Sequence, residues 1–460
     1  SFLCSSTRTG RHRHSSFQCP LCSSTNINSR IFLEMMEPEP RAKPRRQRSI
    51  SVFAEGIREN VDRAFRPRRR KSCSRSTIET SSPVTDPDSA ETQRPRRQRK
   101  NVLHSMIQFL DKGHTHEFDV SSAFLRVSEV DLRKYEPVWS FLPPILDKEV
   151  KAARREQIKD FVENALRNGP KGLVAEFKKI PMYEDFTKMN EFLHQNNRKR
   201  NRYRDIGCFD ESRVKLTLGT NSYIHANYVS SPNNPRRFIC TQGPLPQTCA
   251  DFWYMVIQED VDVIVMLCNF IEAGHIKCAK YYPLNTNESM MFEGGIIISL
   301  KCKERLKFPF ETNAIVEVTT LDVSLPDFPL RSCTHYHWVD WPDQGVPQAD
   351  MAPLYLLYVL EQIRTPIIIH CSAGIGRSGS MVLLQYAMDV LGRGDVLRMM
   401  NIYLEKVRTQ RCSSVQNIQQ YLFVHVVLLN FFQKTGCLPR SLEPALESFR
   451  KSYRRIVREF

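Results

Sequence analysis

Three consecutive isoleucines, at 367–369, lead directly into a glycine-containing turn, and this junction constrains the fold more than any other part of the sequence. A branched aliphatic run of this kind is typical of a buried strand, and residues 378–391 have the composition of a helix. The turn between them reads His-Cys-Ser-Ala-Gly-Ile-Gly-Arg-Ser, with five residues between Cys371 and Arg377. The two glycines allow the main chain to curl so that successive N–H groups point towards one anion. The sequence therefore predicts a strand, an anion-binding loop and a helix in direct succession.

The pair Cys371 and Arg377 has a chemical meaning at such a turn. The helix N-terminus adds partial positive charge to the converging N–H groups, and both effects lower the pKa of a thiol at the base of the loop. We therefore expect Cys371 to be a thiolate near neutral pH and Arg377 to donate two hydrogen bonds to phosphate oxygens. This combination predicts a covalent phosphocysteine mechanism that needs no metal ligands. A buried structural cysteine beside a surface arginine is the alternative, and it leaves the two glycines and the flanking elements unexplained.

Strand-like and helical segments alternate on both sides of this turn. Helical periodicity begins near Lys148 and ends at the Asn-Gly-Pro of residues 168–170, and a second short helix is expected at 173–177. The other expected strands are 224–229, 238–241, 263–267, 295–302, 314–320, 335–339 and 366–369, and the other expected helices are 251–257, 353–363 and 418–432. This mixture predicts one α/β domain over residues 155–435, followed by a basic tail at 436–460.

The first hundred residues differ from the rest in composition. They hold 22 Lys and Arg against 10 Asp and Glu, so +12 of the chain's net charge of +16 lies there, and they are rich in Ser, Arg and Pro. Such a composition predicts a disordered basic tail over residues 1–100, which a partly ordered linker over 101–154 joins to the domain. The chain begins with Ser, and two Met residues stand at 35 and 36, so residues 1–34 are interpreted as a fragment end or a translated leader.

Three short basic clusters recur in this tail, at 44–48, 67–71 and 95–100. They are candidates for contact with an import receptor or an acidic membrane, and a solvated linker is an equal alternative. Nucleic acid is disfavoured as a partner because the other 360 residues are nearly balanced, with 44 basic and 40 acidic side chains. The chain has no membrane-length apolar run and no signal-peptide core, and its 14 cysteines lack regular spacing. We therefore expect a cytoplasmic location, with the nucleus as the alternative.

Four further motifs accompany the turn at 370–379. They are Arg-Asn-Arg-Tyr-Arg-Asp at 200–205, Thr-Gln-Gly-Pro-Leu-Pro at 241–246 with Asp-Phe-Trp at 251–253, a segment containing Trp-Pro-Asp at 337–347, and Val-Gln-Asn-Ile-Gln-Gln-Tyr at 415–421. In this order the five motifs resemble those of the phosphotyrosine-specific, cysteine-based protein tyrosine phosphatases of the non-receptor type. The resemblance covers 155–435 and implies a central twisted mixed β-sheet flanked by helices. It also implies a hydrolase that dephosphorylates phosphotyrosine-containing proteins in signal transduction, with no cofactor and no metal.

The resemblance assigns catalytic roles to six residues. They are Cys371, Arg377, Asp343, Ser378, Gln416 and Gln420. Asp343 is the general acid and later the general base, because cysteine chemistry supplies no proton for the departing tyrosyl oxygen. Ser378 stabilises the departing thiolate, and Gln416 and Gln420 position the attacking water. Taken alone, Asp343 would be better explained as a turn residue that accepts backbone N–H groups.

The resemblance also assigns residues to substrate binding and to support of the site. The substrate-binding residues are Tyr203, Asp205, Ser372, Ala373, Gly374, Ile375, Gly376, Arg377 and Gln416, and the supporting residues are His370, Trp341, Glu272 and Lys277. Tyr203 walls a slot too deep for phosphoserine, and Asp205 holds the N–H groups of the substrate peptide. For Glu272 and Lys277, a solvated surface pair is the alternative. One departure from the family is His225, which stands where the family usually has Asn.

Other classes of function remain to be weighed against an active phosphatase. A phosphotyrosine-binding pseudophosphatase would have lost the chemistry of Cys371, Arg377 or Asp343, and all three are present. A nucleic-acid-binding protein would rest on the basic tail alone. A dual-specificity phosphatase is disfavoured by the motif around Tyr203, which builds a deep slot.

Overall fold

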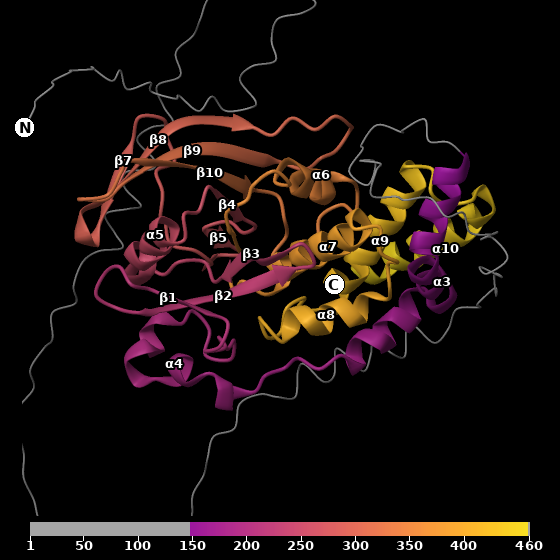
Figure 1. Ribbon diagram of the computed structural model, residues 1–460, viewed down its shortest axis with the longest axis horizontal. Helices are drawn as coiled ribbons and strands as arrows, with labels where there is room; N and C mark the ends of the chain where they lie inside the picture. Colours follow the sequence, from indigo (N-terminus) through magenta and orange to yellow (C-terminus); the bar gives the residue numbers. More distant parts are fainter. Residues whose placement is uncertain (1–147, 459–460) are drawn as a thin grey trace, which may run out of the picture. The chain divides into compact units, whose positions relative to one another are not determined.

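A nine-stranded mixed sheet forms the centre of the fold in the computed structural model, which describes residues 148–458. The strands are β1 (Arg213–Lys215), β2 (Tyr223–Ser231), β3 (Asn234–Thr241), β4 (Val263–Met266), β7 (Ser289–Phe292), β8 (Ile296–Arg305), β9 (Val316–Ser324), β10 (Arg331–Trp338) and β11 (Ile367–His370). Their order across the sheet is β1-β2-β3-β11-β4-β10-β9-β8-β7 (Figure 1). The central strands β3, β11, β4 and β10 are parallel, and the outer strands pair antiparallel. This is the mixed sheet that the sequence resemblance implied.

Strand β11 is central because its isoleucines suit burial on both faces. Ile368 lies opposite Ile239 of β3 and Ile264 of β4, and all three side chains are fully buried. A parallel sheet that is covered on both faces favours such continuous branched aliphatic runs. Because the four central strands run in one direction, the turn that follows β11 lies at the same edge as the segments that follow β4 and β10. The candidate site is built at this edge.

Eight helices surround the sheet in the described part of the chain. They are α3 (Lys148–Lys179), α4 (Asn190–Leu193), α5 (Cys249–Gln258), α6 (Ala352–Val359), α7 (Gly376–Gly392), α8 (Met400–Arg408), α9 (Ile418–Lys434) and α10 (Glu443–Arg458). Helix α7 packs on β11, β3 and β2, while α3, α9 and α10 pack on one another at one end of the molecule (Figure 1). The expected break at 168–170 is present inside α3, where Gly169 has a non-helical φ of 60° before Pro170.

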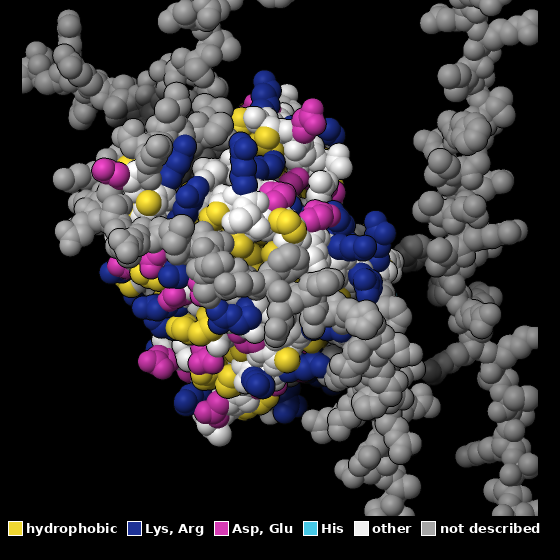
Figure 2. Space-filling model, turned by 90° about the vertical axis from the view of Figure 1, so that its right-hand side faces the viewer, with side chains coloured by type: hydrophobic (Ala, Val, Ile, Leu, Met, Phe, Trp, Pro, Cys, Tyr) yellow, Lys and Arg dark blue, Asp and Glu magenta, His cyan; other side chains and the backbone are white. Residues whose placement is uncertain are grey.

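Helix α10 extends the folded unit beyond the boundary expected from the sequence. Residues 436–460 were expected to be a basic tail, but Leu446, Phe449, Tyr453 and Ile456 are buried against α3 and α9. The basic residues of this segment alternate with these apolar ones at helical spacing, so they lie on the outer face. Figure 2 shows this end of the molecule, where Lys and Arg side chains lie among acidic and apolar ones. At the N-terminal side of the described residues, the helix begins at Lys148, as its periodicity predicted, so the folded unit includes residues before 155, where the domain was expected to begin.

The predictions for the N-terminal tail, its basic clusters and most of the linker concern residues 1–147, which lie outside the described residues. Among residues 148–458, no helix combines the length and the apolar character needed to cross a membrane.

Candidate active site

Cys371 lies in the tight turn between β11 and α7. Its side chain is 3% exposed, and the N–H of Gly374 donates to its Sγ at 3.3 Å. Gly374 has a φ of 69°, and a Cβ there would lie 2.0 Å from the carbonyl oxygen of Thr241. Only glycine fits this position, because the conformation and the close main chain both exclude a side chain. Helix α7 begins at Gly376, so the thiol faces a helix N-terminus, as expected from the sequence.

The surroundings of Cys371 favour its thiolate. Burial alone would raise the pKa of this thiol, but the charge of Arg377, the polar groups of Ser378 and the hydrogen bond from the N–H of Gly374 lower it below its ordinary value. At Cys240, on neighbouring β3, burial outweighs the charge of Arg411 and raises the pKa of the thiol to about 12. The lowered pKa therefore comes from the turn and from Arg377, since burial acts in the opposite direction.

A fork of hydrogen bonds fixes the guanidinium of Arg377. NH1 and NH2 donate to Oε1 and Oε2 of Glu272 at 2.6 and 2.8 Å, and both side chains are buried. NH1 also donates to the carbonyl oxygen of Trp341, at 3.3 Å. Glu272 is therefore an orienting partner of Arg377 in this structure and not a solvated surface residue.

Asp343 bridges the same arginine and a lysine. Its Oδ1 accepts from Arg377 NH2 at 3.1 Å, and its Oδ2 lies 2.6 Å from Lys277 Nζ. Burial tends to lower the pKa of Lys277, but its contact with Asp343 raises it above the ordinary value. The loop is anchored by Trp341, which is 1% exposed and packs edge-on against Trp338 and Phe423. The anchored loop thus places the carboxylate of Asp343 at the opening of the pocket over the Cys371 thiol.

A cavity of about 130 Å³ opens over Cys371. It is lined by Tyr203, Asp205, Ile206, Lys277, Asp343, Gln344, Cys371, Ser372, Ala373, Gly376, Arg377, Gln416 and Gln420. Eleven of these thirteen residues are site residues expected from the sequence, and Ile206 and Gln344 are additions. The polar residues are contributed by five separate segments of the chain, so the site depends on the whole fold and not on one motif.

Two hydrogen-bonded contacts define the walls of this cavity. The hydroxyl groups of Tyr203 and Ser372 lie 2.8 Å apart, which fixes the ring of Tyr203 at the rim. At the opposite wall, the main-chain N–H of Gln416 donates to Oε1 of Gln420 at 2.8 Å. Asn417 caps α9 by accepting from the N–H of Gln420. Gln420 thus enters the cavity from the first turn of the capped helix α9, and Gln416 from the residue just before the cap.

Several expected site residues support the cavity from behind without lining it. They are His370, Trp341, Glu272, Ser378, Gly374 and Ile375. The hydroxyl of Tyr281 lies 2.8 Å from Nε2 of His370 and 2.7 Å from Nε2 of His335. Burial lowers the pKa of His370 to about 3, so this ring is neutral beside the nucleophile.

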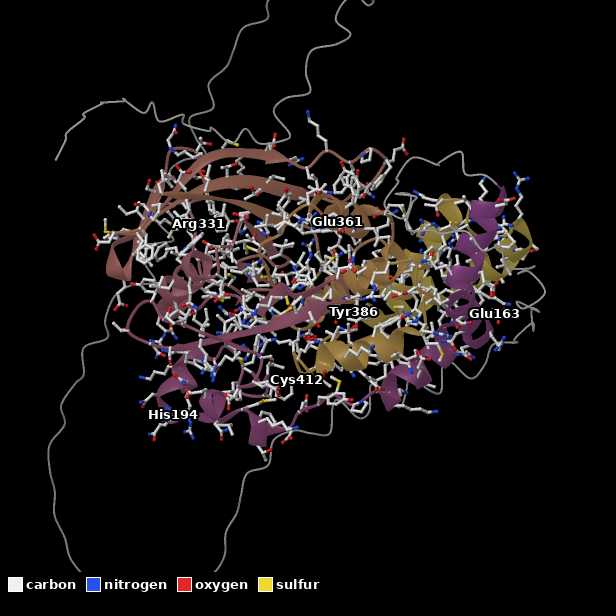
Figure 3. All side chains as sticks on the ribbon, in the orientation of Figure 1. Glu163, His194, Arg331, Glu361, Tyr386 and Cys412 are labelled. Carbon is white, nitrogen blue, oxygen red and sulfur yellow. The ribbon has the colours of Figure 1, made fainter. Side chains whose placement is uncertain are left out.

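Sequence reasoning missed one residue that holds the turn. Arg411 is fully buried and donates to the carbonyl oxygens of Ala373 and Gly374, at 2.9 and 3.2 Å. Its NH1 and NH2 also lie 3.2 Å from Nδ1 of His225, whose Nε2 lies 2.9 Å from the carbonyl oxygen of Ile206. Neighbouring Cys412 is labelled in Figure 3. The signal available was the departure at His225, which the sequence alone did not connect with Arg411.

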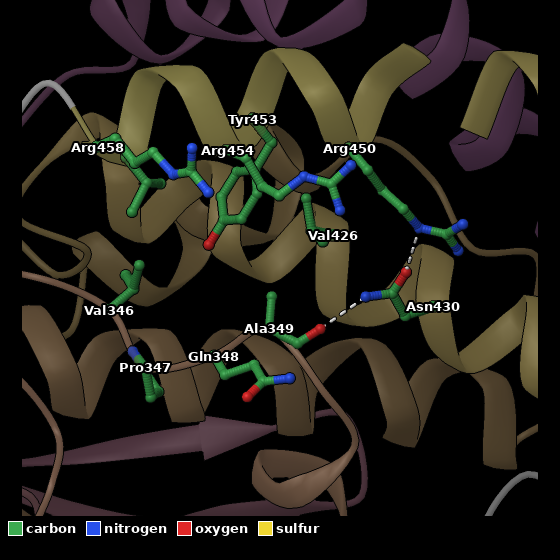
Figure 4. A pocket seen from close by; sticks show the side chains of 11 residues that line it. Val346, Pro347, Gln348, Ala349, Val426, Asn430, Arg450, Tyr453, Arg454 and Arg458 are labelled. Atoms are coloured by element: carbon green, nitrogen blue, oxygen red, sulfur yellow. Dashed lines mark hydrogen bonds between the residues drawn. The ribbon is translucent and has the colours of Figure 1, made fainter. Parts of the chain in front are cut away.

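A second cavity, of about 450 Å³, lies between α10, α9 and residues 346–349 (Figure 4). Arg454 and Arg458 lie along its α10 side, and the amide of Asn430 donates to the carbonyl oxygen of Ala349 at 2.6 Å. Its lining contains no cysteine, histidine or carboxylate. It therefore offers no thiol, imidazole or carboxylate for catalysis, although it is larger than the cavity over Cys371. In residues 148–458, no group of three His, Cys, Asp or Glu side chains is arranged to hold a metal ion.

Comparison with known proteins agrees with this geometry. A family model described as protein-tyrosine phosphatase matches residues 197–430. Human tyrosine-protein phosphatase non-receptor type 12 is 36% identical over 251 residues, which are 52% of this chain and 31% of that protein. Human non-receptor type 2 is 34% identical over 239 residues, which are 51% of this chain and 56% of that protein. The chain thus spans about a third to about half of the length of these relatives.

Comparison with solved structures also indicates similarity to protein tyrosine phosphatases. The catalytic domain of human protein tyrosine phosphatase non-receptor type 18 is 29% identical, with a TM-score of 0.51 over 61% of this chain and 99% of that one. A complex of PTPN18 with HER2-pY1196 phosphopeptides gives a TM-score of 0.52 at 28% identity, over 59% of this chain and 96% of that one. Since the family model spans half of the sequence and includes every motif of the cavity, the chain belongs to the protein-tyrosine phosphatase family, with non-receptor phosphatases among its relatives.

Proposed function

We propose that this chain hydrolyses phosphotyrosine in proteins through a phosphocysteine intermediate. One observation carries the proposal: a buried thiol of lowered pKa, Cys371, lies beside a fixed guanidinium, Arg377, that also contacts a loop carboxylate, Asp343. A nucleophile, an anion clamp and a proton donor are the three groups that displacement at a phosphate monoester requires. Membership of the family supports the same reaction.

In the proposed first step, Cys371 Sγ attacks phosphorus. The sulfur–phosphorus bond forms as the bond from phosphorus to the tyrosyl oxygen breaks, and that oxygen takes a proton from Asp343. Arg377 and the main-chain N–H groups of 372–377 bind the other three phosphate oxygens. The negative charge that develops on these oxygens is thereby stabilised by groups that are already in place.

In the proposed second step, water attacks the phosphocysteine. Gln416 and Gln420 orient the water, and Asp343 accepts its proton as the phosphorus–sulfur bond breaks. Ser378 stabilises the thiolate that leaves. Asp343 is well placed for both proton transfers because its loop covers the cavity that contains the two glutamines.

The proposed substrate class follows from the shape of the cavity. Tyr203 would stack on the ring of a phosphotyrosine, and Asp205 would accept hydrogen bonds from the substrate main chain. Ser372, Ala373, Gly374, Ile375 and Gly376 would bind phosphate through their N–H groups, while His370, Trp341, Glu272 and Lys277 would support the site. PTPN18 in complex with phosphopeptides supports phosphotyrosine-containing proteins as partners.

The deciding experiment compares wild-type protein with Cys371→Ser on a phosphotyrosine peptide and on the matching phosphoserine peptide. We expect the variant to keep its fold by circular dichroism and to lose turnover by several orders of magnitude. Residual turnover above about one per cent would exclude the covalent role of Cys371. Equal kcat/KM for phosphotyrosine and phosphoserine would exclude the deep slot. A wild-type protein that binds phosphotyrosine without turnover would be a recognition module instead.

We also propose where the protein acts. The non-receptor relatives support action in the cytoplasm, and the basic clusters at 44–48, 67–71 and 95–100 would add contacts with an import receptor or an acidic membrane. The import receptor would give access to the nucleus. A comparison of the full chain with a chain that lacks residues 1–147 tests these proposals, as argued below.

A further inference from the structure

Two isoleucines are exposed on a short hairpin beside the catalytic cavity. The hairpin pairs β5 (Ile271–Glu272) with β6 (His275–Ile276), and Ile271 and Ile276 are 64% and 69% exposed. They are direct cross-strand partners, so their side chains lie together on one face of the hairpin. Glu272, the next residue, points away from them to Arg377. Branched side chains have few rotamers, so this pair forms a preformed apolar surface.

Residues next to both isoleucines connect the hairpin to the cavity. Glu272 binds Arg377, and Lys277 lines the cavity together with Cys371. The guanidinium NH1 of Arg202 donates to the carbonyl oxygen of Ile276 at 3.2 Å, and Arg202 directly precedes Tyr203. The apolar pair is therefore continuous with the rim of the proposed phosphotyrosine slot.

The cations that border this pair are already engaged. Arg202 also donates to the carbonyl oxygens of Gly243 and Pro244, at 3.0 and 2.7 Å. Lys277 contacts Asp343 at 2.6 Å. Neither cation is free to bind an acidic residue of a substrate without giving up these contacts. This side of the rim consequently presents an aliphatic surface rather than a basic one.

We propose that Ile271 and Ile276 bind an apolar side chain of the substrate peptide, at a position one to three residues from the phosphotyrosine. This inference rests on the proposed function, because the peptide is the chain that the cavity would hold by its phosphotyrosine. An extended peptide advances about 3.3–3.6 Å per residue, so a side chain one to three residues from the phosphotyrosine is within reach of a hairpin that borders the rim. The substrate class is thus a phosphotyrosine with a Leu-, Ile-, Val- or Phe-like neighbour.

The test is a set of phosphotyrosine peptides in which Leu or Ser stands at each position from three before to three after the phosphotyrosine. For wild-type protein, we expect KM to fall about fivefold with Leu at one or two adjacent positions, with kcat unchanged, because the contact involves groups remote from the reacting bond. In the double variant Ile271→Ser/Ile276→Ser, this preference disappears. Turnover of a small aryl phosphate, which has no neighbouring residues, stays at the wild-type value.

A matched control is Leu330→Ser. Leu330 is 66% exposed, and neighbouring Arg331 is labelled in Figure 3 at the opposite end of the molecule from α3. This variant should keep the Leu preference. If the double variant also lost turnover of aryl phosphate, the single variants Ile271→Ser and Ile276→Ser would be measured in its place.

Equal KM for all peptides in an active wild-type protein would overturn the inference and leave the proposed function intact. Absence of wild-type turnover on any phosphotyrosine peptide and on aryl phosphate would overturn the proposed function. Self-association of the wild-type protein that the double variant abolishes, with unchanged peptide KM, would assign the pair to a contact between copies of the chain.

Discussion

At the scale of single residues, Arg377 serves two acidic partners in different ways. The carboxylate of Glu272 accepts hydrogen bonds from NH1 and NH2 on the side away from the cavity. Asp343 accepts a hydrogen bond from NH2 only, at the opening of the cavity. An incoming phosphate would compete with Asp343 and not with Glu272, because it enters from the cavity. Displacement of its contact with Arg377 by phosphate would leave the carboxyl group of Asp343 beside the leaving oxygen, where a general acid must lie.

The first prediction follows from this division of roles. Replacement of Asp343 by Ala or Asn should lower kcat on a phosphotyrosine peptide by about 10²–10⁴-fold, with little change in KM. The measurement is steady-state kinetics with both variants. A leaving group of low pKa needs less protonation, so a nitro-substituted aryl phosphate should lose less rate. An equal loss for both substrates would contradict the role of general acid.

The second prediction concerns the ionisation of Cys371. Since the pKa of this thiol is lowered, its alkylation by iodoacetate should reach half of its maximal rate at a pH below the ordinary thiol value. Ser378→Ala removes a hydroxyl group that lowers the pKa of this thiol, which should move the midpoint to higher pH. Mass spectrometry of the Cys371 peptide gives the rate at each pH. A midpoint above the ordinary value, as burial alone would produce, would contradict the assignment.

The residues of the cavity could be predicted from sequence where they lie within contiguous motifs, and not where they act across the fold. Cys371 and Arg377 share one turn, so their spacing reveals their contact. Arg411 contacts Gly374, which is 37 positions away, and His225, which is 186 positions away. Neither separation corresponds to a period of a helix or a strand, so no local pattern indicates the contact.

At the scale of elements, length decided what the sequence could predict. Strands β2, β3, β4, β8, β9, β10 and β11 and the helices α5, α6, α7 and α9 were expected near their observed positions, because their apolar patterns carry concordant signals. The short strands β1, β5, β6 and β7, the four-residue helix α4 and the nine-residue helix α8 were missed. A strand of two residues cannot show alternation, and its pairing depends on the neighbours that the fold supplies.

The third prediction concerns α10 as part of the folded unit. Phe449 is 3% exposed and belongs to the same apolar cluster as the core of the sheet. Phe449→Ala should therefore lower the free energy of unfolding by about 3 kcal/mol, through lost burial and the cavity that remains. Arg455→Ala, on the exposed face of the same helix, should change it by less than about 0.5 kcal/mol. Urea unfolding followed by tryptophan fluorescence measures both values, and equal small changes would mean that α10 is not part of the cooperative unit.

At the scale of the whole molecule, the fold and the charge divide the chain at different places. The structure describes a unit from Lys148 to Arg458 that contains every residue of the candidate site. Most of the net charge lies in the first hundred residues, which contain 22 basic and 10 acidic side chains. The residues of the candidate site and most of the excess basic residues thus lie in separate segments, so either segment can be deleted without the other.

The fourth prediction tests this separation. A fragment of residues 148–458 should turn over a small aryl phosphate with the kcat of the full chain, because all groups of the cavity and the apolar partners of α3, α9 and α10 are retained. A fragment of residues 150–440, which the sequence alone would favour, lacks α10 and should unfold at a lower temperature, since the apolar surface under that helix becomes exposed.

The fragment 148–458 should also change its location in cells, because the basic clusters that would bind an import receptor or an acidic membrane are absent. Kinetics, thermal unfolding and fluorescence microscopy of tagged chains measure the three effects. A large fall in kcat for 148–458 would make the tail part of the catalytic unit, and an unchanged location would leave the basic clusters as a solvated linker.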